Sequence, residues 1–153
     1  MCAPPRGNTT RRASRIRRGG ATRRPSRWEN MTAVVAKVYD ALPDAEKRQC
    51  AILGSNYGET GAINYFGPAH GLPCAFSVHN NHFFWGPPAF QPSVIIHIGG
   101  SRESLERFCE DVRVAATVQS EYAMPYETNL PIYVCRGLKV LLPESWRAAK
   151  KFI

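Results

Sequence analysis

The sequence lacks several features that would assign it to a large class of proteins. It has no run of 18 or more apolar residues, so no segment has the length of a membrane-spanning helix. Residues 1–28 lack the apolar middle segment of a secretory signal peptide, and we expect the chain as written to be cytoplasmic. The cysteines are odd in number and have no CxxC spacing, so we expect buried thiols rather than a zinc site or a disulfide framework. They are Cys2, Cys50, Cys74, Cys109 and Cys135.

Acidic residues are missing from one part of the chain only. Residues 1–28 contain nine arginines and no acid, whereas the remainder has eleven Lys and Arg against twelve Asp and Glu, a net charge of −1. Residues 1–27 hold Ile16 as their one large aliphatic side chain, too little to offset the entropy of ordering. We therefore predict a disordered Arg-rich leader over 1–27 and one soluble α/β domain over 28–153. A nucleic-acid binder acting through the leader is one alternative function, although nucleic acid is not the expected partner.

Helical and strand patterns alternate along the domain. Apolar spacing predicts helices over 28–42, 58–66 and 101–112 and a short one from residue 143, the third carrying Leu105, Phe108, Cys109 and Val112 on one face. Short apolar runs predict strands at 50–53, 73–78, 94–98, 114–118 and 132–135. This alternation predicts an α/β fold, a three-layer Rossmann-like, mostly parallel sheet with helices on both faces.

Polar side chains follow three of the predicted strands. In an open parallel sheet, ligands bind beyond the carboxyl ends of the strands, so these turns are expected to meet at one edge. Amides, imidazoles, a carboxylate and aromatic rings suit a ligand rich in hydroxyl groups, although turns also use Gly and Asn for backbone reasons alone. The candidate ligand-binding residues are Asn56, Tyr57, Glu59, His79, Asn80, Asn81, His82, Trp85 and Arg102.

Catalytic and metal signatures are weak. No GxSxG motif is present, and His79 and His82 have only Glu59 or His97 as a further candidate metal ligand. We therefore expect no metal, no cofactor and no catalytic residue. A second alternative function is a free-standing small-molecule-binding enzyme in which Glu59 acts as base and His79 or His82 as acid.

Blocks of the sequence resemble one family. They are 56–63 (NYGETGAI), 65–68 (YFGP), 71–73 (GLP), 77–81 (SVHNN), 85–87 (WGP), 124–127 (MPYE), 129–133 (NLPIY) and 135–137 (CRG). In this order they resemble the C-terminal soluble region of bacterial membrane enzymes of glycosyltransferase family 39, the dolichyl-phosphate-mannose-protein mannosyltransferase-like group. The sequence departs from the family pattern at Val78, where glycine is usual, and at residues 82–84.

The resemblance implies a function in sugar transfer. Members of the family move a sugar from a polyprenyl phosphate to an acceptor at the outer face of the membrane, and their catalytic carboxylate lies near the first transmembrane helix, a region without counterpart here. The chain is therefore expected to be a detached or truncated domain that binds sugar or acceptor without catalysing transfer alone. The implied partners are a polyprenyl-phosphate sugar, an acceptor glycan or protein, and a membrane-spanning transferase subunit. The implied location is extracytoplasmic.

Overall fold

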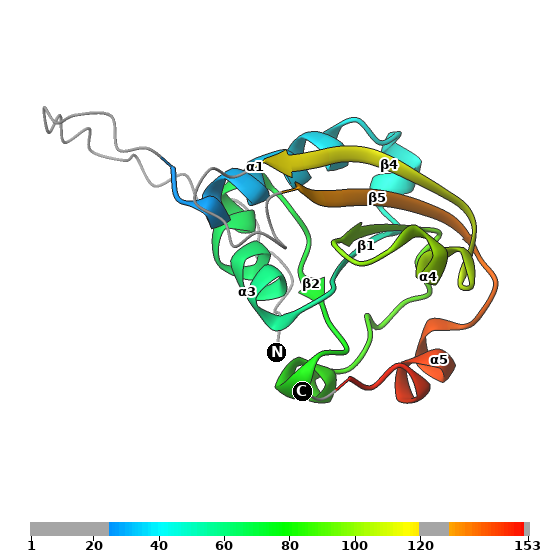
Figure 1. Ribbon diagram of the computed structural model, residues 1–153. Helices are drawn as coiled ribbons and strands as arrows, with labels where there is room; N and C mark the ends of the chain where they lie inside the picture. The colour runs from blue at the N-terminus through cyan, green and yellow to red at the C-terminus, as the bar shows by residue number, and fades with distance from the viewer. Residues whose placement is uncertain (1–24, 120–128, 152–153) are drawn as a thin grey trace, which may run out of the picture.

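A computed structural model of the chain describes residues 25–119 and 129–151. The helices are α1 (Arg27–Asp40), α2 (Asp44–Lys47), α3 (Tyr57–Phe66), α4 (Arg102–Glu106) and α5 (Leu142–Ala148), with 3₁₀-helices η1 (Gly67–His70) and η2 (Asn80–Trp85). The strands are β1 (Cys50–Gly54), β2 (Ala75–Phe76), β3 (Val94–Ile98), β4 (Cys109–Gln119) and β5 (Asn129–Leu138). Figure 1 shows their arrangement. Within the described ranges, no helix combines the length and apolar character needed to traverse a bilayer. Residues 1–24 of the predicted leader lie outside these ranges. The predicted end of the leader at residue 27 is wrong, because Ser26 caps α1 and Arg27 begins it.

The five strands form one mixed sheet in the order β2-β1-β3-β5-β4. β1 runs parallel to β2 and to β3, whereas β5 runs antiparallel to both β3 and β4. The prediction of a mostly parallel, Rossmann-like sheet is therefore wrong. The strand bounds of the structure give the reason: only nine residues, 120–128, separate β4 from β5, whereas a parallel connection needs a crossover of about a dozen or more.

The first helix follows the predicted pattern. Ser26 and Glu29 form a capping box at its start, in which the Ser26 hydroxyl accepts a hydrogen bond from the Glu29 amide and the Glu29 carboxylate accepts one from the Ser26 amide. Met31, Val35 and Val38 are buried on one face, as their spacing predicts. The helix ends at Asp40, two residues before the predicted end at the buried Leu42, which Pro43 follows.

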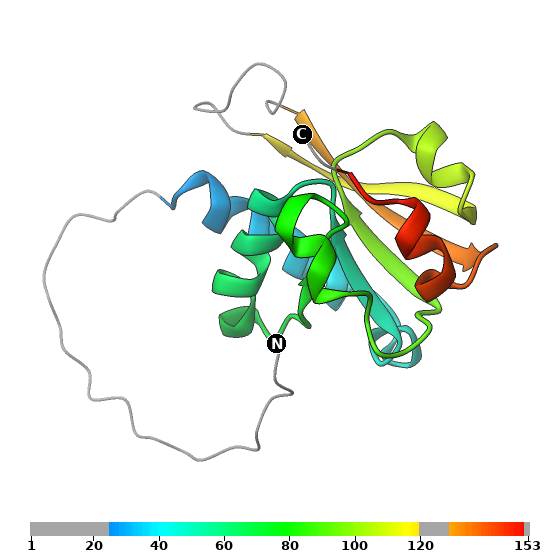
Figure 2. The ribbon, with the colours of Figure 1, turned by 90° about the horizontal axis from the view of Figure 1, so that it is seen from below.

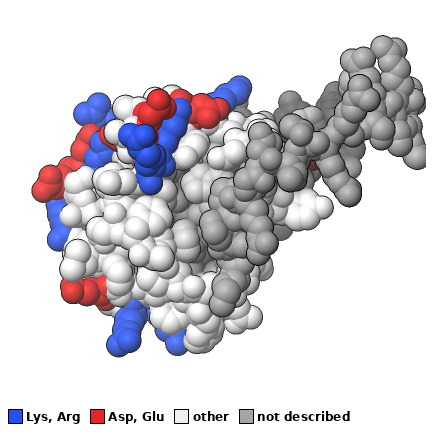
Figure 3. Space-filling view, turned by 180° about the vertical axis from the view of Figure 1, so that it is seen from behind, with Lys and Arg blue, Asp and Glu red and all other residues white. Residues whose placement is uncertain are grey.

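Two hydrophobic clusters lie on opposite faces of the sheet. Side chains of α1 and α3 pack on one face against Ile52 and Ile96. Leu105 of α4 packs on the other face with Ile95 and Tyr133. Figure 2 shows α1 and α3 together on one side of the molecule and α4 and α5 on the other. In Figure 3, charged side chains of both signs gather in the upper and left parts of the face and at its bottom, and the surface between them that is not grey is uncharged.

The third predicted helix is wrong over its second half. α4 ends at Glu106, and Cys109 already begins β4. Cys109 is disulfide-bonded to Cys135 of β5, and Val112 pairs with Cys135 in the sheet. Pairing with a neighbouring strand thus overrides a helical spacing that the local sequence carries. Phe108, expected on the buried helical face, is 42% exposed.

The disulfide also corrects the expectation of free buried thiols. Cys109 and Cys135 are both buried, with Cα atoms 6.0 Å apart, and they form a covalent link between the two long strands. Cys50 is a free buried cysteine. Burial raises the pKa of the Cys50 thiol to about 12, so this side chain behaves as a small hydrophobic group, as expected from the sequence.

Replacing Cys109 and Cys135 together by alanine should lower the free energy of unfolding by about 3 kcal/mol, because the cross-link closes a loop with a sequence separation of 26. Urea unfolding without reductant measures this difference. Non-reducing peptide mapping of the wild-type protein should recover both cysteines in one cross-linked pair of peptides. Two separate peptides, or a double variant as stable as the wild type, would contradict the linkage.

One ion pair joins α2 to the sheet. The Arg136 guanidinium donates two hydrogen bonds of 2.8 Å to the Glu46 carboxylate. This hydrogen bonding, aided by the positive charge, holds the pKa of Glu46 below its ordinary value, although burial opposes the shift. A carboxyl pKa that is lower in the folded state stabilises the fold above the unfolded-state pKa, and this contribution is lost as pH falls through the folded-state pKa.

Glu46→Gln should therefore lower the free energy of unfolding at pH 7 by at most about 1 kcal/mol, because the pair is partly exposed to solvent. The difference from the wild type should shrink as pH is lowered through the acidic range and vanish below the folded-state pKa of Glu46. Urea unfolding at a series of pH values measures it. Glu110→Gln, at an exposed position on β4 outside this ion pair, is the matched control for the same change of side chain. A pH-independent deficit for Glu46→Gln would exclude the ion pair as its cause.

Candidate functional site

The turns after β1 and β3 meet, as predicted for the ends of neighbouring parallel strands. The Ser55 amide donates to the Ile98 carbonyl at 3.0 Å. Gly99 adopts a positive φ of 70°, and a Cβ atom there would lie 2.6 Å from Ser55 Oγ and 3.1 Å from Glu59 Oε1. Glycine is thus required at position 99 both by the backbone conformation and by the closeness of the first turn.

The side chain of Glu59, in the first turn of α3, folds back to cap the start of its own helix. Its Oε2 atom accepts hydrogen bonds from the Ser55 amide (2.8 Å), the Ser55 hydroxyl (3.0 Å) and the Asn56 amide (3.2 Å). Its Oε1 atom accepts from Asn56 Nδ2 at 2.9 Å, while Asn56 Oδ1 accepts from the Glu59 amide. The side chain is 4% exposed. This reciprocal capping box explains Asn56 and Glu59 structurally and leaves the carboxylate poorly placed to act as a base on a ligand.

A ring contact brings the turns after β1 and β2 together. The Tyr57 ring, which is 56% exposed, stacks on the buried His79 imidazole with centroids 5.4 Å apart and an interplanar angle of 18°. Asn80 has a positive φ of 51°, and its amide donates to the Lys151 carbonyl at 2.9 Å. Asn81 is exposed beside it. These residues of the candidate set therefore form one edge of the molecule.

A second pair of rings lies in η2. His82 contacts Trp85 with centroids 4.2 Å apart, and the Trp85 side chain is 66% exposed. Burial, and to a lesser extent the proximity of His79, lowers the pKa of His82, which favours the neutral ring at pH 7. Nδ1 of His79 and Nδ1 of His82 are both buried and have no hydrogen-bond partner within residues 25–119 and 129–151. Both nitrogens therefore lie beneath this edge, out of contact with solvent.

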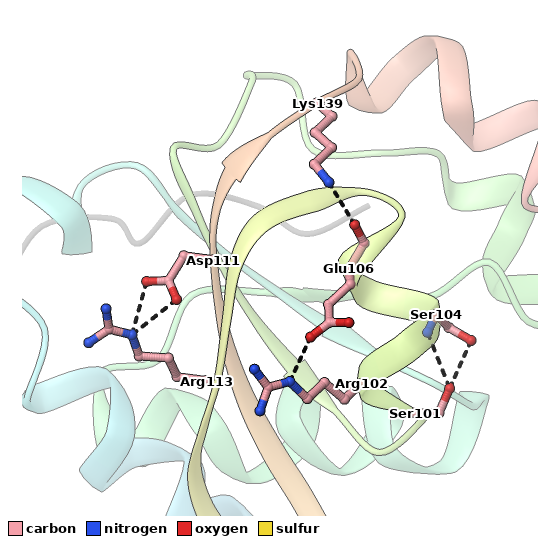
Figure 4. A network of polar contacts seen from close by, with 7 residues as sticks. All are labelled: Ser101, Arg102, Ser104, Glu106, Asp111, Arg113 and Lys139. Atoms are coloured by element: carbon pink, nitrogen blue, oxygen red, sulfur yellow. Dashed lines mark hydrogen bonds and ion pairs between the residues drawn. The ribbon is translucent and has the colours of Figure 1, made fainter.

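Arg102 makes no described contact with the other candidate residues. It begins α4, which packs on the opposite face of the sheet from α3. Its guanidinium pairs with Glu106 along the exposed side of that helix at 2.7 Å, as Figure 4 shows. We therefore define the candidate site, called here the ring edge, as Tyr57, His79, Asn80, Asn81, His82 and Trp85.

The part of the chain that the structure describes contains no group of three or more His, Cys, Asp or Glu side chains placed to hold a metal ion. His97, a further candidate ligand in the sequence, lies instead on the sheet face that α4 and α5 cover. There it lines an apolar cavity that sequence reasoning missed. The sequence did contain a sign of this cavity. His97 is the one polar residue in the apolar run 94–98, and the alternation of side chains along a strand places it on the same face as Ile95.

Glu59→Ala should lower the free energy of unfolding by about 2 kcal/mol, because the amides of Ser55 and Asn56 lose their acceptor at a largely buried position. Thermal and urea unfolding measure the loss. Glu29→Ala, at the matching position of the α1 capping box, is the control and should cost about 1 kcal/mol or less. A Glu59→Ala variant with unchanged stability would contradict the capping role and favour a role in chemistry.

Comparison with known proteins does not extend these observations. No protein-family model, curated protein or solved structure matches the chain.

Proposed function

We propose that the chain is a sugar- or acceptor-binding accessory domain of a polyprenyl-phosphate-sugar-dependent membrane glycosyltransferase, with no transferase activity of its own. The observation that carries this proposal is the ring edge, where the partly exposed rings of Tyr57 and Trp85 each lie against a histidine. Exposed aromatic faces bind the apolar C–H faces of sugars, and neighbouring polar groups bind their hydroxyls.

The polar groups at the ring edge suit a neutral, hydroxyl-bearing ligand. The exposed Asn81 amide can both donate a hydrogen bond to a hydroxyl group and accept one from it. The lowered pKa of His82 favours its neutral ring. A positive charge nevertheless lies beside η2, because Lys150 Nζ is 5.2 Å from the Phe83 ring and 5.3 Å from the Phe84 ring. The ligand part that the exposed rings and the Asn81 amide fit is the sugar or acceptor glycan, and the sugar phosphates test whether the charge of Lys150 contributes to binding.

The Cys109–Cys135 disulfide supports the location that the resemblance implies. Disulfides persist in oxidising compartments and are rare in the cytosol. A domain that works beside a membrane transferase at the outer face of the membrane would fold under such conditions. We accordingly propose the extracytoplasmic side as its place of action, with a membrane-spanning transferase subunit as its partner.

Binding of sugars tests the proposal directly. Methyl glycosides of common hexoses and pentoses, and the matching sugar 1-phosphates, are titrated into ¹⁵N-labelled protein while the amide spectrum and the Trp85 indole N–H are followed. We expect at least one neutral glycoside to give saturable shifts confined to the ring edge. Trp85→Ala should weaken this binding about tenfold, the effect of losing one stacking contact.

The control is Tyr65→Ala, which removes a ring that is 79% exposed on α3 but lies outside the ring edge. It should leave the affinity unchanged. Absence of saturable binding by every sugar, or an equal loss in both variants, would refute sugar recognition at this edge. Tighter binding of the sugar phosphates than of the neutral glycosides would show that charge, rather than stacking on the rings, dominates recognition at this edge.

A further inference from the structure

An apolar cavity of about 230 Å³ lies between the sheet, α4 and α5. Leu53 and Ile95 contribute from the sheet, Leu105 from α4, and Trp146 from α5. No charged side chain is among the residues that line it. A cavity of about 150 Å³ with such walls holds a benzene molecule, so this one has room for a larger ring system.

Hydrogen bonds hold the cover of the cavity in place. The Leu142 amide at the start of α5 donates to Gln91 Oε1 at 3.0 Å, and Gln91 Nε2 donates to the Val140 carbonyl at 3.3 Å. Trp146 Nε1 donates to the Phe83 carbonyl at 3.0 Å. The disulfide-bonded Cys109 and Cys135 form part of the wall. The space is therefore preformed by anchored elements rather than left by a loosely packed helix.

His97 is the polar group that distinguishes the cavity from an inert void. Its Nδ1 atom lies 3.1 Å from the Gly99 carbonyl oxygen, which can only accept a hydrogen bond, so Nδ1 carries the proton. Burial lowers the pKa of His97, although the hydrogen bond to Gly99 opposes the shift, and the ring is neutral at pH 7. Nε2 is consequently an unprotonated acceptor, and no residue of the described ranges donates to it.

We propose that this cavity binds a small neutral molecule with an apolar body of about nine to twelve non-hydrogen atoms and one hydroxyl or N–H group that donates to His97 Nε2. The apolar walls select the body, and the Nε2 acceptor of His97 selects the donor. The hydroxyls of Ser101, Ser104 and Ser145 also line the cavity, but each already takes part in a hydrogen bond within the protein. Charged molecules are excluded, because the lining offers no countercharge to offset their desolvation. This site is separate from the ring edge and does not depend on sugar binding.

Indole and benzofuran form a matched pair of probes for the wild-type protein. They have nearly the same shape, but only indole has an N–H donor. Titration followed by ¹⁵N and methyl-resolved NMR should show saturable binding, with intermolecular NOEs to the methyl groups of Leu53 and Ile95. Indole should bind about threefold to tenfold more tightly, the effect of one net hydrogen bond. His97→Leu should abolish this preference while keeping the binding of benzofuran.

Filling the cavity provides a second test. Ser145 lies on the face of α5 that lines it, whereas Ala148 is an exposed residue of the same helix outside the lining. Ser145→Leu should abolish binding of both probes, and the matched Ala148→Leu should leave it unchanged. If the amide spectrum shows that Ser145→Leu does not fold, the NOEs and the preference for indole in the wild-type protein still test whether the probes bind in this cavity.

Three results would overturn the proposal: no saturable binding of either probe, NOEs located elsewhere, or unchanged binding in a folded Ser145→Leu variant. Equal affinities of indole and benzofuran would remove the role given to His97. Failure of sugar binding would not change the results expected for indole and benzofuran. These probes are detected at residues of the cavity, such as Leu53 and Ile95, whereas the glycosides are detected at the ring edge. The two proposals are therefore tested independently.

Discussion

The structure depends on the pairing of β3 with two strands of opposite direction. On one side Ile96 pairs in parallel register with Ile52 of β1, and on the other it pairs in antiparallel register with Val134 of β5. The strand joins the βαβ half of the molecule to the long β4–β5 pair. Its side chains alternate between the two hydrophobic clusters, so one short segment anchors both cores. A one-residue shift in its register would exchange the two sets of side chains and disrupt both faces.

Much of the local structure was predictable because its causes are local. Met31, Val35 and Val38 form the buried face of α1 that their spacing predicted. The apolar run 94–98 forms a strand as expected. Strand direction was not predictable in the same way, since it depends on which strands become neighbours. The absence of a predicted helix between the last two strands was the available warning. Cys109 shows the same limit, because its disulfide partner lies 26 residues away and no local pattern identifies it.

The candidate site was predictable in its position more than in its chemistry. Topology places the ends of β1, β2 and β3 at one edge, and the Tyr57–His79 contact and the closeness of Gly99 to Ser55 follow from that. The roles of individual side chains depend on short-range geometry that residue type does not determine. Glu59 turns inward to cap its own helix, and Arg102 pairs along α4 on the other face of the sheet. Both are polar residues that follow a strand, yet their contacts are explained by the helices in whose first turns they lie.

Trp146 links the two proposed binding regions. Its ring lines the cavity and stacks on Phe83, with centroids 6.3 Å apart and an interplanar angle of 16°, while its indole N–H donates to the Phe83 carbonyl. Phe83 belongs to η2, the segment that also carries His82 and Trp85 of the ring edge. One side chain of α5 thus supports the cover of the cavity and the 3₁₀-helix of the ring edge together. A buried indole that satisfies its N–H on a backbone carbonyl is costly to move. The two regions are therefore held at a defined separation even though their ligands differ in chemistry.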